Sequence, residues 1–144
     1  MSRARMALIL RWALAAVFFA AALPKIYSPH DFAVAVFRYQ MLPYALVNAV
    51  ALFLPWLELL CAIALVAAPR WREAALTMIL GLLIVFTAAI AINLYRGIDT
   101  ACGCFTVKPG ARHMGWWNLG RNALLILAGL GAWPHRRGEV NGRP

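Results

Sequence analysis

Two of the three cysteines of this chain lie one residue apart, in the stretch Cys102-Gly103-Cys104. Thiols at this spacing can form a disulfide where the chain turns, because the Cα atoms of bonded cysteines lie about 4.4–6.8 Å apart. Gly103 favours such a turn, since glycine adopts backbone conformations that other residues resist. The ring so closed is small, and strained, exposed disulfides are the labile or catalytic kind. The pair therefore indicates thiol–disulfide exchange as the leading chemistry.

Two other interpretations of the pair stay open. Two thiolates also suit a soft metal ion, with His113 and Met114 nearby in the sequence as further Cu(I) or zinc ligands. Paired Cys-x-x-Cys knuckles, the strong signature of zinc, are absent from the sequence, so we assign no metal site. A structural disulfide that only tightens its loop is the third interpretation. Cys61 differs, because it lies in an apolar run where a thiol packs as a small hydrophobic side chain.

The composition places this chemistry in a membrane. Of the 144 residues, 64% are hydrophobic and 13% are charged, whereas soluble domains carry about 45–50% and about 25%. Such an excess of apolar side chains calls for a lipid bilayer as the solvent. The formal net charge is +9, but no basic stripe or recognition motif accompanies it, so nucleic-acid binding is not expected.

Four apolar runs are long enough to cross a hydrocarbon core of about 30 Å. They cover about residues 6–23, 46–68, 74–95 and 116–133. Lipid cannot satisfy bare backbone groups, so each run is predicted to be an α-helix. The sequence thus predicts an all-α integral membrane protein, a four-transmembrane-helix bundle over residues 7–133. The remaining residues, 134–144, are predicted to be a polar, disordered cytoplasmic tail.

The first run has a second interpretation. A basic start, an apolar centre and small residues after it are also typical of a cleavable signal peptide, whose loss would leave three spans. Arg11 interrupts the apolar centre, which favours a helix that is retained as a signal-anchor.

The positive charges predict an orientation. With four spans both termini share one side, which carries seven arginines: Arg3, Arg5, Arg70, Arg72, Arg136, Arg137 and Arg143. The other side carries five basic residues: Lys25, Arg38, Arg96, Lys108 and Arg112. The positive-inside rule then places both termini in the cytoplasm. The Cys-Gly-Cys pair is therefore predicted to face the periplasm or the cell exterior, where disulfides persist.

The first connection on the outer side is predicted to contain a short amphipathic helix. Between Pro29 and Pro43, large apolar side chains recur near helical spacing among polar residues. Such a helix lies at the membrane interface. It is either a lid over the outer end of the bundle or a segment that rests on lipid.

Ionisable and aromatic residues in the spans are the remaining candidates for a site. A bare carboxylate at Glu58 is costly in mid-membrane, so this residue needs a proton or a buried partner. We expect Arg11 or Arg121 as that partner, with Lys25 nearer the outer boundary. A structural ion pair, a proton relay and contact with a cofactor all fit Glu58. The indoles of Trp56, Trp116 and Trp117 suit an interfacial aromatic belt, and they would also stack on a flat quinone ring.

Four stretches of the chain resemble the MauE family, which belongs with the DoxX-like four-helix membrane proteins. They are PKIYSPHDFAVAVFRYQMLP, LPWLELLC, FTAAIAINLYRGIDTACGCF and GWWNLGRNALL. The resemblance covers about residues 7–132, and its most specific part is Cys-Gly-Cys-Phe after an Asn-Leu-x-Arg-Gly helix end. Thr106 departs from the pattern, because the family often has glycine there.

The resemblance implies a redox-associated inner-membrane protein of methylamine utilisation. It implies support for the maturation or disulfide formation of a periplasmic partner, such as the disulfide-rich small subunit of methylamine dehydrogenase. Carried over by position, Cys102 and Cys104 become the redox pair, and Lys25, Glu58 and Arg121 become further site residues. The DoxX-like relatives bring a membrane quinone into consideration as the cofactor. A non-enzymatic assembly or anchoring subunit and a soft-metal handling protein remain the alternatives.

Overall fold

The structure, a computed structural model, describes residues 3–97 and 115–133. Its elements in chain order are α1 (Arg3–Tyr27), α2 (Pro29–Arg38), α3 (Tyr44–Ala67), the 3₁₀ turn η1 (Pro69–Trp71), α4 (Arg72–Tyr95) and α5 (Trp116–Gly131). The prediction of an all-α chain is confirmed for these residues. The Cys102-Gly103-Cys104 stretch and the predicted tail at 134–144 lie outside them.

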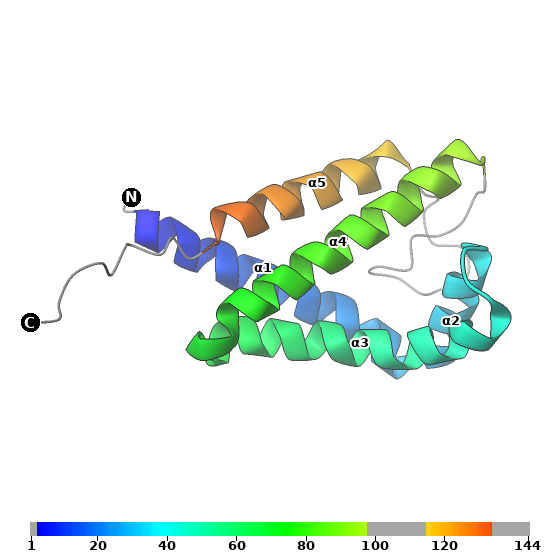
Figure 1. The fold of residues 1–144 in the computed structure, drawn as a ribbon, viewed down its shortest axis with the longest axis horizontal. Coiled ribbons are helices and arrows are strands. Elements are labelled where there is room, and N and C mark those ends of the chain that lie inside the picture. Colours follow the sequence, from blue (N-terminus) through cyan, green and yellow to red (C-terminus); the bar gives the residue numbers. More distant parts are fainter. Residues whose placement is uncertain (1–2, 98–114, 134–144) are drawn as a thin grey trace, which may run out of the picture.

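The long helices of the described chain close into a ring. α1 packs against α3, α3 against α4, α4 against α5, and α5 back against α1. Figure 1 shows that α1 and α4 run toward one end of the ring, while α3 and α5 run away from it. We call this the α2 end, because α2 lies there between the end of α1 and the start of α3. The opposite end, where η1 joins α3 to α4, is the η1 end.

Three helices in the described part of the chain are long and apolar enough to cross a membrane: Arg5–Tyr27, Tyr44–Ala67 and Pro69–Tyr95. α5 has 16 residues, or about 24 Å at 1.5 Å per residue, which is shorter than a hydrocarbon core of about 30 Å. The predicted count of four transmembrane helices is therefore not confirmed. The sequence run extended to residue 133, but the helix ends at Gly131.

The outer surface of the ring suits lipid. Large apolar side chains such as Phe53 and Leu124 are about two-thirds exposed or more. The hydroxyl of Thr87 donates to the carbonyl of Leu83 one turn earlier, at 2.6 Å, so it needs no water. Exposed aromatic side chains lie at both ends of the ring: Tyr27, Tyr44, Tyr95, Trp116 and Trp117 at the α2 end, and Trp71 and Trp133 at the η1 end. This distribution matches the two aromatic belts of a membrane protein.

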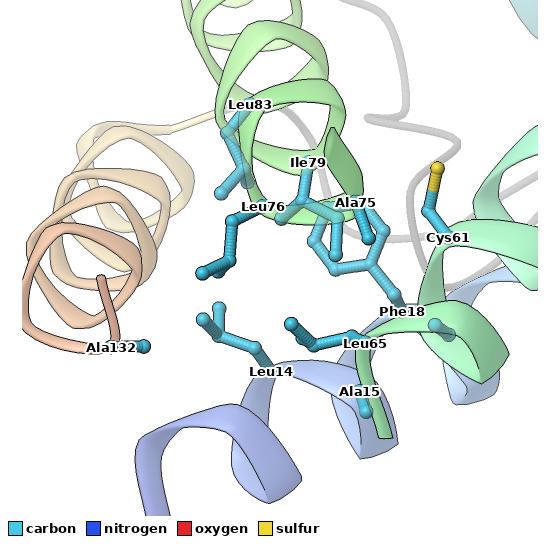
Figure 2. Close-up of a cluster of buried hydrophobic side chains, with 11 residues drawn as sticks. Leu14, Ala15, Phe18, Cys61, Leu65, Ala75, Leu76, Ile79, Leu83 and Ala132 are labelled. Atoms are coloured by element: carbon cyan, nitrogen blue, oxygen red, sulfur yellow. The ribbon is translucent and has the colours of Figure 1, made fainter. Parts of the chain in front are cut away.

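The apolar core fills the half of the ring nearer the η1 end. Figure 2 shows side chains of α1, α3 and α4 interlocking there, with Leu14, Leu65 and Ile79 fully buried. Cys61 lies at the edge of this cluster as a buried free thiol, which confirms the prediction that it packs as a hydrophobic residue. The cluster therefore supplies the hydrophobic contacts that hold three of the helices together.

The C-terminal end of α5 makes specific contacts with α1 and α4. Arg11 Nε of α1 donates to the carbonyl oxygen of Ala132 at 3.0 Å, which satisfies a carbonyl at the end of α5. Gly129 allows close approach to α4, because a Cβ there would come within 2.6 Å of Leu80 Cδ2. This contact requires the small residue, since helices approach closely only where side chains are small.

α2 confirms the predicted amphipathic helix between Pro29 and Pro43. Pro29 opens it, Asp31 lies in its first turn and Arg38 in its last turn, so its charges complement the helix dipole. Phe32 is buried at 3% exposure, while the opposite face is open. α2 packs on α3 and α1 but not on α4. It thus covers the end of the ring on one side only.

Candidate functional site

A buried ion pair joins the last turn of α1, at the α2 end, to the middle of α3. Lys25 Nζ donates to both carboxylate oxygens of Glu58, at 2.7 and 2.8 Å. The two side chains are 1% and 2% exposed. Both hydrogen bonds are charge-assisted, the arrangement that a buried charge in a membrane requires.

The prediction that Arg11 or Arg121 pairs with Glu58 is wrong, because the partner of Glu58 is Lys25. α1 continues past Pro24 as far as Tyr27, and it therefore carries Lys25 into the bundle rather than to its boundary. Arg11 lies near the other end, where it binds the end of α5. Arg121 is half-buried on α5.

A proline accompanies each charge of the pair. Pro24 directly precedes Lys25, and Pro55 lies three residues before Glu58, both inside their helices. Because proline has no N–H, the carbonyls of Ala20 and Ala51 lack the regular donor four residues later. The ion pair therefore lies where both helices have already lost a backbone hydrogen bond.

An apolar cavity of about 510 Å³ lies beside the pair, between α2, α3 and α4. This volume is within the range of about 300–1,000 Å³ that is usual for small-molecule sites. Its described lining includes Val36 of α2, Leu54 of α3 and Val85 of α4, and Lys25 is the charged residue among them. Its described lining thus combines mostly apolar side chains with the cationic donor of Lys25 and the side chain of Tyr39.

Two phenylalanines flank the ammonium group where it meets the cavity. Lys25 Nζ lies 5.0 Å from the ring centroid of Phe32 and 5.3 Å from that of Phe86. Both distances allow a cation–π attraction. Phe86 could not be identified from the sequence, because a phenylalanine in the uniformly apolar run of α4 carries no signal that separates it from its lipid-facing neighbours.

Two buried asparagines add polar groups to the half of the ring nearer the α2 end. Asn93 of α4 is fully buried, and neither its Nδ2 nor its Oδ1 has a hydrogen-bond partner among the described residues. Asn122 of α5 is 3% exposed, and its Nδ2 also lacks one. A second cavity, of about 30 Å³, is lined by Asn122, Glu58 and Lys25. It is large enough for a water molecule that binds these groups.

The other predicted site residues fall into two sets. Trp116 and Trp117 are 80% and 82% exposed at the start of α5; the described lining of the cavity includes phenylalanines but not these indoles. Cys102, Gly103 and Cys104 lie outside the described residues, as do His113 and Met114 of the soft-metal alternative. Within residues 3–97 and 115–133, no three His, Cys, Asp or Glu side chains gather as metal ligands.

Comparison with known proteins identifies relatives over most of the chain. The family described as Methylamine utilisation protein MauE matches residues 3–134. The Methylamine utilization protein MauE of Methylophilus methylotrophus is 41% identical over 119 residues, which are 81% of this chain and 60% of that protein. That of Methylorubrum extorquens is 40% identical over 118 residues (78% and 61%), and that of Paracoccus denitrificans is 38% identical over 123 residues (84% and 64%).

The matches cover most of this chain but only part of each relative. The chain spans about three fifths of the length of the relatives it matches. No solved structure matches it. The family match nevertheless covers nearly all of the chain, including every described helix. The chain therefore belongs to the MauE family of methylamine utilisation proteins.

Proposed function

We propose that this protein is a membrane thiol–disulfide oxidoreductase of methylamine utilisation, which oxidises cysteines of a periplasmic partner through Cys102 and Cys104. One observation carries the proposal. The helix ends that flank the cysteine pair in the sequence, Tyr95 of α4 and Trp116 of α5, both lie at the α2 end. Lys25 and the apolar cavity that it lines belong to the same half of the ring.

The proposed exchange conserves electrons and protons. A thiolate of the partner attacks the Cys102–Cys104 disulfide, forms a mixed disulfide and releases one thiol. A second partner thiolate then displaces the remaining cysteine, so the partner gains a disulfide and the pair gains two electrons and two protons. Oxidation of the pair transfers both electrons and both protons to a membrane quinone, which becomes a quinol. The partner that the family resemblance implies is the disulfide-rich small subunit of a methylamine dehydrogenase.

The proposal includes an orientation in the bacterial inner membrane with α5 as a fourth span and both termini cytoplasmic. α5 packs alongside α1 and α4, and exposed indoles lie at its two ends, Trp116 and Trp133. A bilayer can thin locally around a helix that is a few ångströms short. Both features are those of a short membrane-crossing helix.

Single cysteines in a cysteine-free background test this orientation. We expect a membrane-impermeant maleimide to label Gln40→Cys in intact cells, and to label Arg70→Cys and Trp133→Cys only after permeabilisation. Labelling of Trp133→Cys together with Gln40→Cys would show that α5 does not cross. Labelling of Gln40→Cys and Arg70→Cys from one side would contradict the arrangement of α3.

Thiol trapping tests the redox proposal. Cells that make the full chain are quenched with acid and alkylated with a mass-tagged maleimide, with and without prior reduction. A Cys61→Ala background removes the third thiol. We expect a Cys102–Cys104 disulfide that becomes reduced when quinone is depleted and re-forms when it is restored. We also expect a partner that keeps only one of its reacting cysteines to accumulate a mixed disulfide with the pair, because no second partner thiolate is present to displace it.

The double variant Cys102→Ser, Cys104→Ser decides between the proposal and an assembly role. If the partner acquires its disulfides as fast with this variant as with the unmodified chain, the exchange mechanism is wrong. The protein would then act as a non-enzymatic anchoring subunit. Stoichiometric copper or zinc that is lost in the double variant would instead support soft-metal handling.

A further inference from the structure

We infer that the apolar cavity beside Lys25 binds the ring of an isoprenoid quinone, with a ring carbonyl that accepts a hydrogen bond from the Lys25 ammonium group. The inference rests on the proposed function, in which a membrane quinone is the electron acceptor. It adds the residues of this chain that would bind the quinone.

The hydrogen-bond inventory of Lys25 supports a neutral oxygen acceptor. An ammonium group has three N–H donors, and two of them are used by Glu58 Oε1 and Oε2. No described residue other than Glu58 accepts from Nζ, although Lys25 lines the cavity. A neutral carbonyl oxygen can accept the third hydrogen bond without adding charge. A second carboxylate at this position would place an uncompensated negative charge inside the membrane.

The walls of the cavity support a flat, apolar molecule. Phe32 of α2 and Phe86 of α4 lie on the two sides of the cavity and close to the ammonium group. Aromatic rings stack in offset or edge-to-face arrangements on other planar rings. Farther from Lys25, Val50, Leu54 and Val85 offer aliphatic contacts of the kind that an isoprenoid tail requires.

The position of the cavity supports entry from the bilayer. α2 packs on α3 but not on α4, so the cavity separates α2 from α4. Val85 lines it and is 64% exposed on α4, and Met41, in the connection after α2, is 42% exposed. Because Val85 lies on the exposed face of a helix that is long and apolar enough to cross a membrane, a lipid-dissolved molecule would reach the cavity without passing through water.

The chemistry of reduction gives Lys25 and Glu58 a defined role. Conversion of a quinone to a quinol consumes two protons together with the two electrons that the thiol pair supplies. A hydrogen bond from Lys25 would stabilise negative charge that develops on the ring oxygen. Glu58 holds the ammonium group in place, so it is a positioning residue for this step.

Equilibrium binding of decylubiquinone to the full chain in nanodiscs tests the inference without any turnover. The double variant Lys25→Met, Glu58→Met removes the donor and leaves no unpaired charge; we expect it to weaken binding roughly ten- to a hundredfold, as for loss of a charge-assisted hydrogen bond. Val85→Trp places a larger side chain at the cavity and should also weaken binding. Leu124→Trp is the matched control, because Leu124 is 67% exposed on α5 and is not part of the described lining.

Three outcomes decide the matter. The Cys102→Ser, Cys104→Ser variant should bind decylubiquinone as tightly as the unmodified chain, so a failure of the thiol proposal leaves this result intact. The inference would be overturned if decylubiquinone bound equally well to three proteins: the double variant Lys25→Met, Glu58→Met, the single variant Val85→Trp, and the unmodified chain. Competition by a saturated-chain phospholipid that is equally strong with and without Lys25 would also overturn it and identify the cavity as a lipid site.

Discussion

Removal of one partner of the Lys25–Glu58 pair should destabilise the protein far more than removal of both. The two side chains are 1% and 2% exposed and are joined at 2.7 and 2.8 Å. They therefore belong with buried pairs, for which loss of one partner costs about 3–5 kcal/mol, rather than with surface pairs, for which it costs about 0–1 kcal/mol. At about 1.4 kcal/mol per factor of ten, Lys25→Met should raise the unfolding equilibrium constant by a factor of about 10² to 4 × 10³.

The double variant distinguishes the cost of an unpaired buried charge from the cost of changed side-chain packing. In Lys25→Met, Glu58→Met no charge is left unpaired, and replacement of a buried pair by apolar residues of similar volume is often neutral or stabilising. We expect its free energy of unfolding to lie within about 1 kcal/mol of that of the unmodified chain. The measurement is equilibrium unfolding in mild detergent, followed by circular dichroism at increasing mole fractions of sodium dodecyl sulfate.

A surface pair on the same chain provides the control. His30 and Asp31 of α2 lie 3.7 Å apart with side chains 90% and 43% exposed, so Asp31→Asn should change the free energy of unfolding by less than about 1 kcal/mol. The reasoning is refuted if Lys25→Met costs no more than Asp31→Asn. It is also refuted if the double variant is as unstable as the sum of the two single variants.

Three further predictions concern the packing of the bundle. Gly129→Leu should cost about 1–3 kcal/mol through overpacking against α4, whereas Gly120→Leu should not, because nothing lies within 4 Å of a Cβ there; thermal unfolding in detergent compares the two. Arg11→Met removes the hydrogen bond to Ala132 and should cost about 1.5–3 kcal/mol in the same assay, and an unchanged midpoint would show that this bond does not hold α5. Cys61 should resist maleimide until the protein is unfolded, and Cys61→Ser should be less stable than Cys61→Ala, because it buries a hydroxyl in the apolar cluster.

The positions of the helices could be predicted from the sequence, because apolar runs in a membrane have few alternatives to helix. The runs at 46–68 and 74–95 became α3 (Tyr44–Ala67) and α4 (Arg72–Tyr95). The short segment after Pro29 also became the expected helix α2. The length of α5 was overestimated, since Ala132 and Trp133 are as apolar as the residues of the helix before them.

The partner of Glu58 and the cavity could not be predicted in the same way. In a chain whose lipid-facing and core-facing residues are both apolar, the sequence carries little information about the rotation of each helix. Which lysine or arginine reaches Glu58 depends on that rotation and on where α1 ends. Phe86 borders the cavity for the same reason, without any local signal. The role of the cysteine pair stays a prediction, because it lies outside the described residues.

The two prolines beside the ion pair also determine where this bundle can bend. Helices bend most sharply at proline, where one hydrogen bond of the ladder is missing. Pro24 and Pro55 lie at the level of Lys25 and Glu58, and the chain between them carries α2, Val50 and Leu54, one wall of the cavity. The opposite wall belongs to α4, which is continuous from Arg72 to Tyr95 without a proline. A bend at these two prolines would move residues 24–55, and with them that wall of the cavity, relative to α4, and the Lys25–Glu58 contact lies beside both bends.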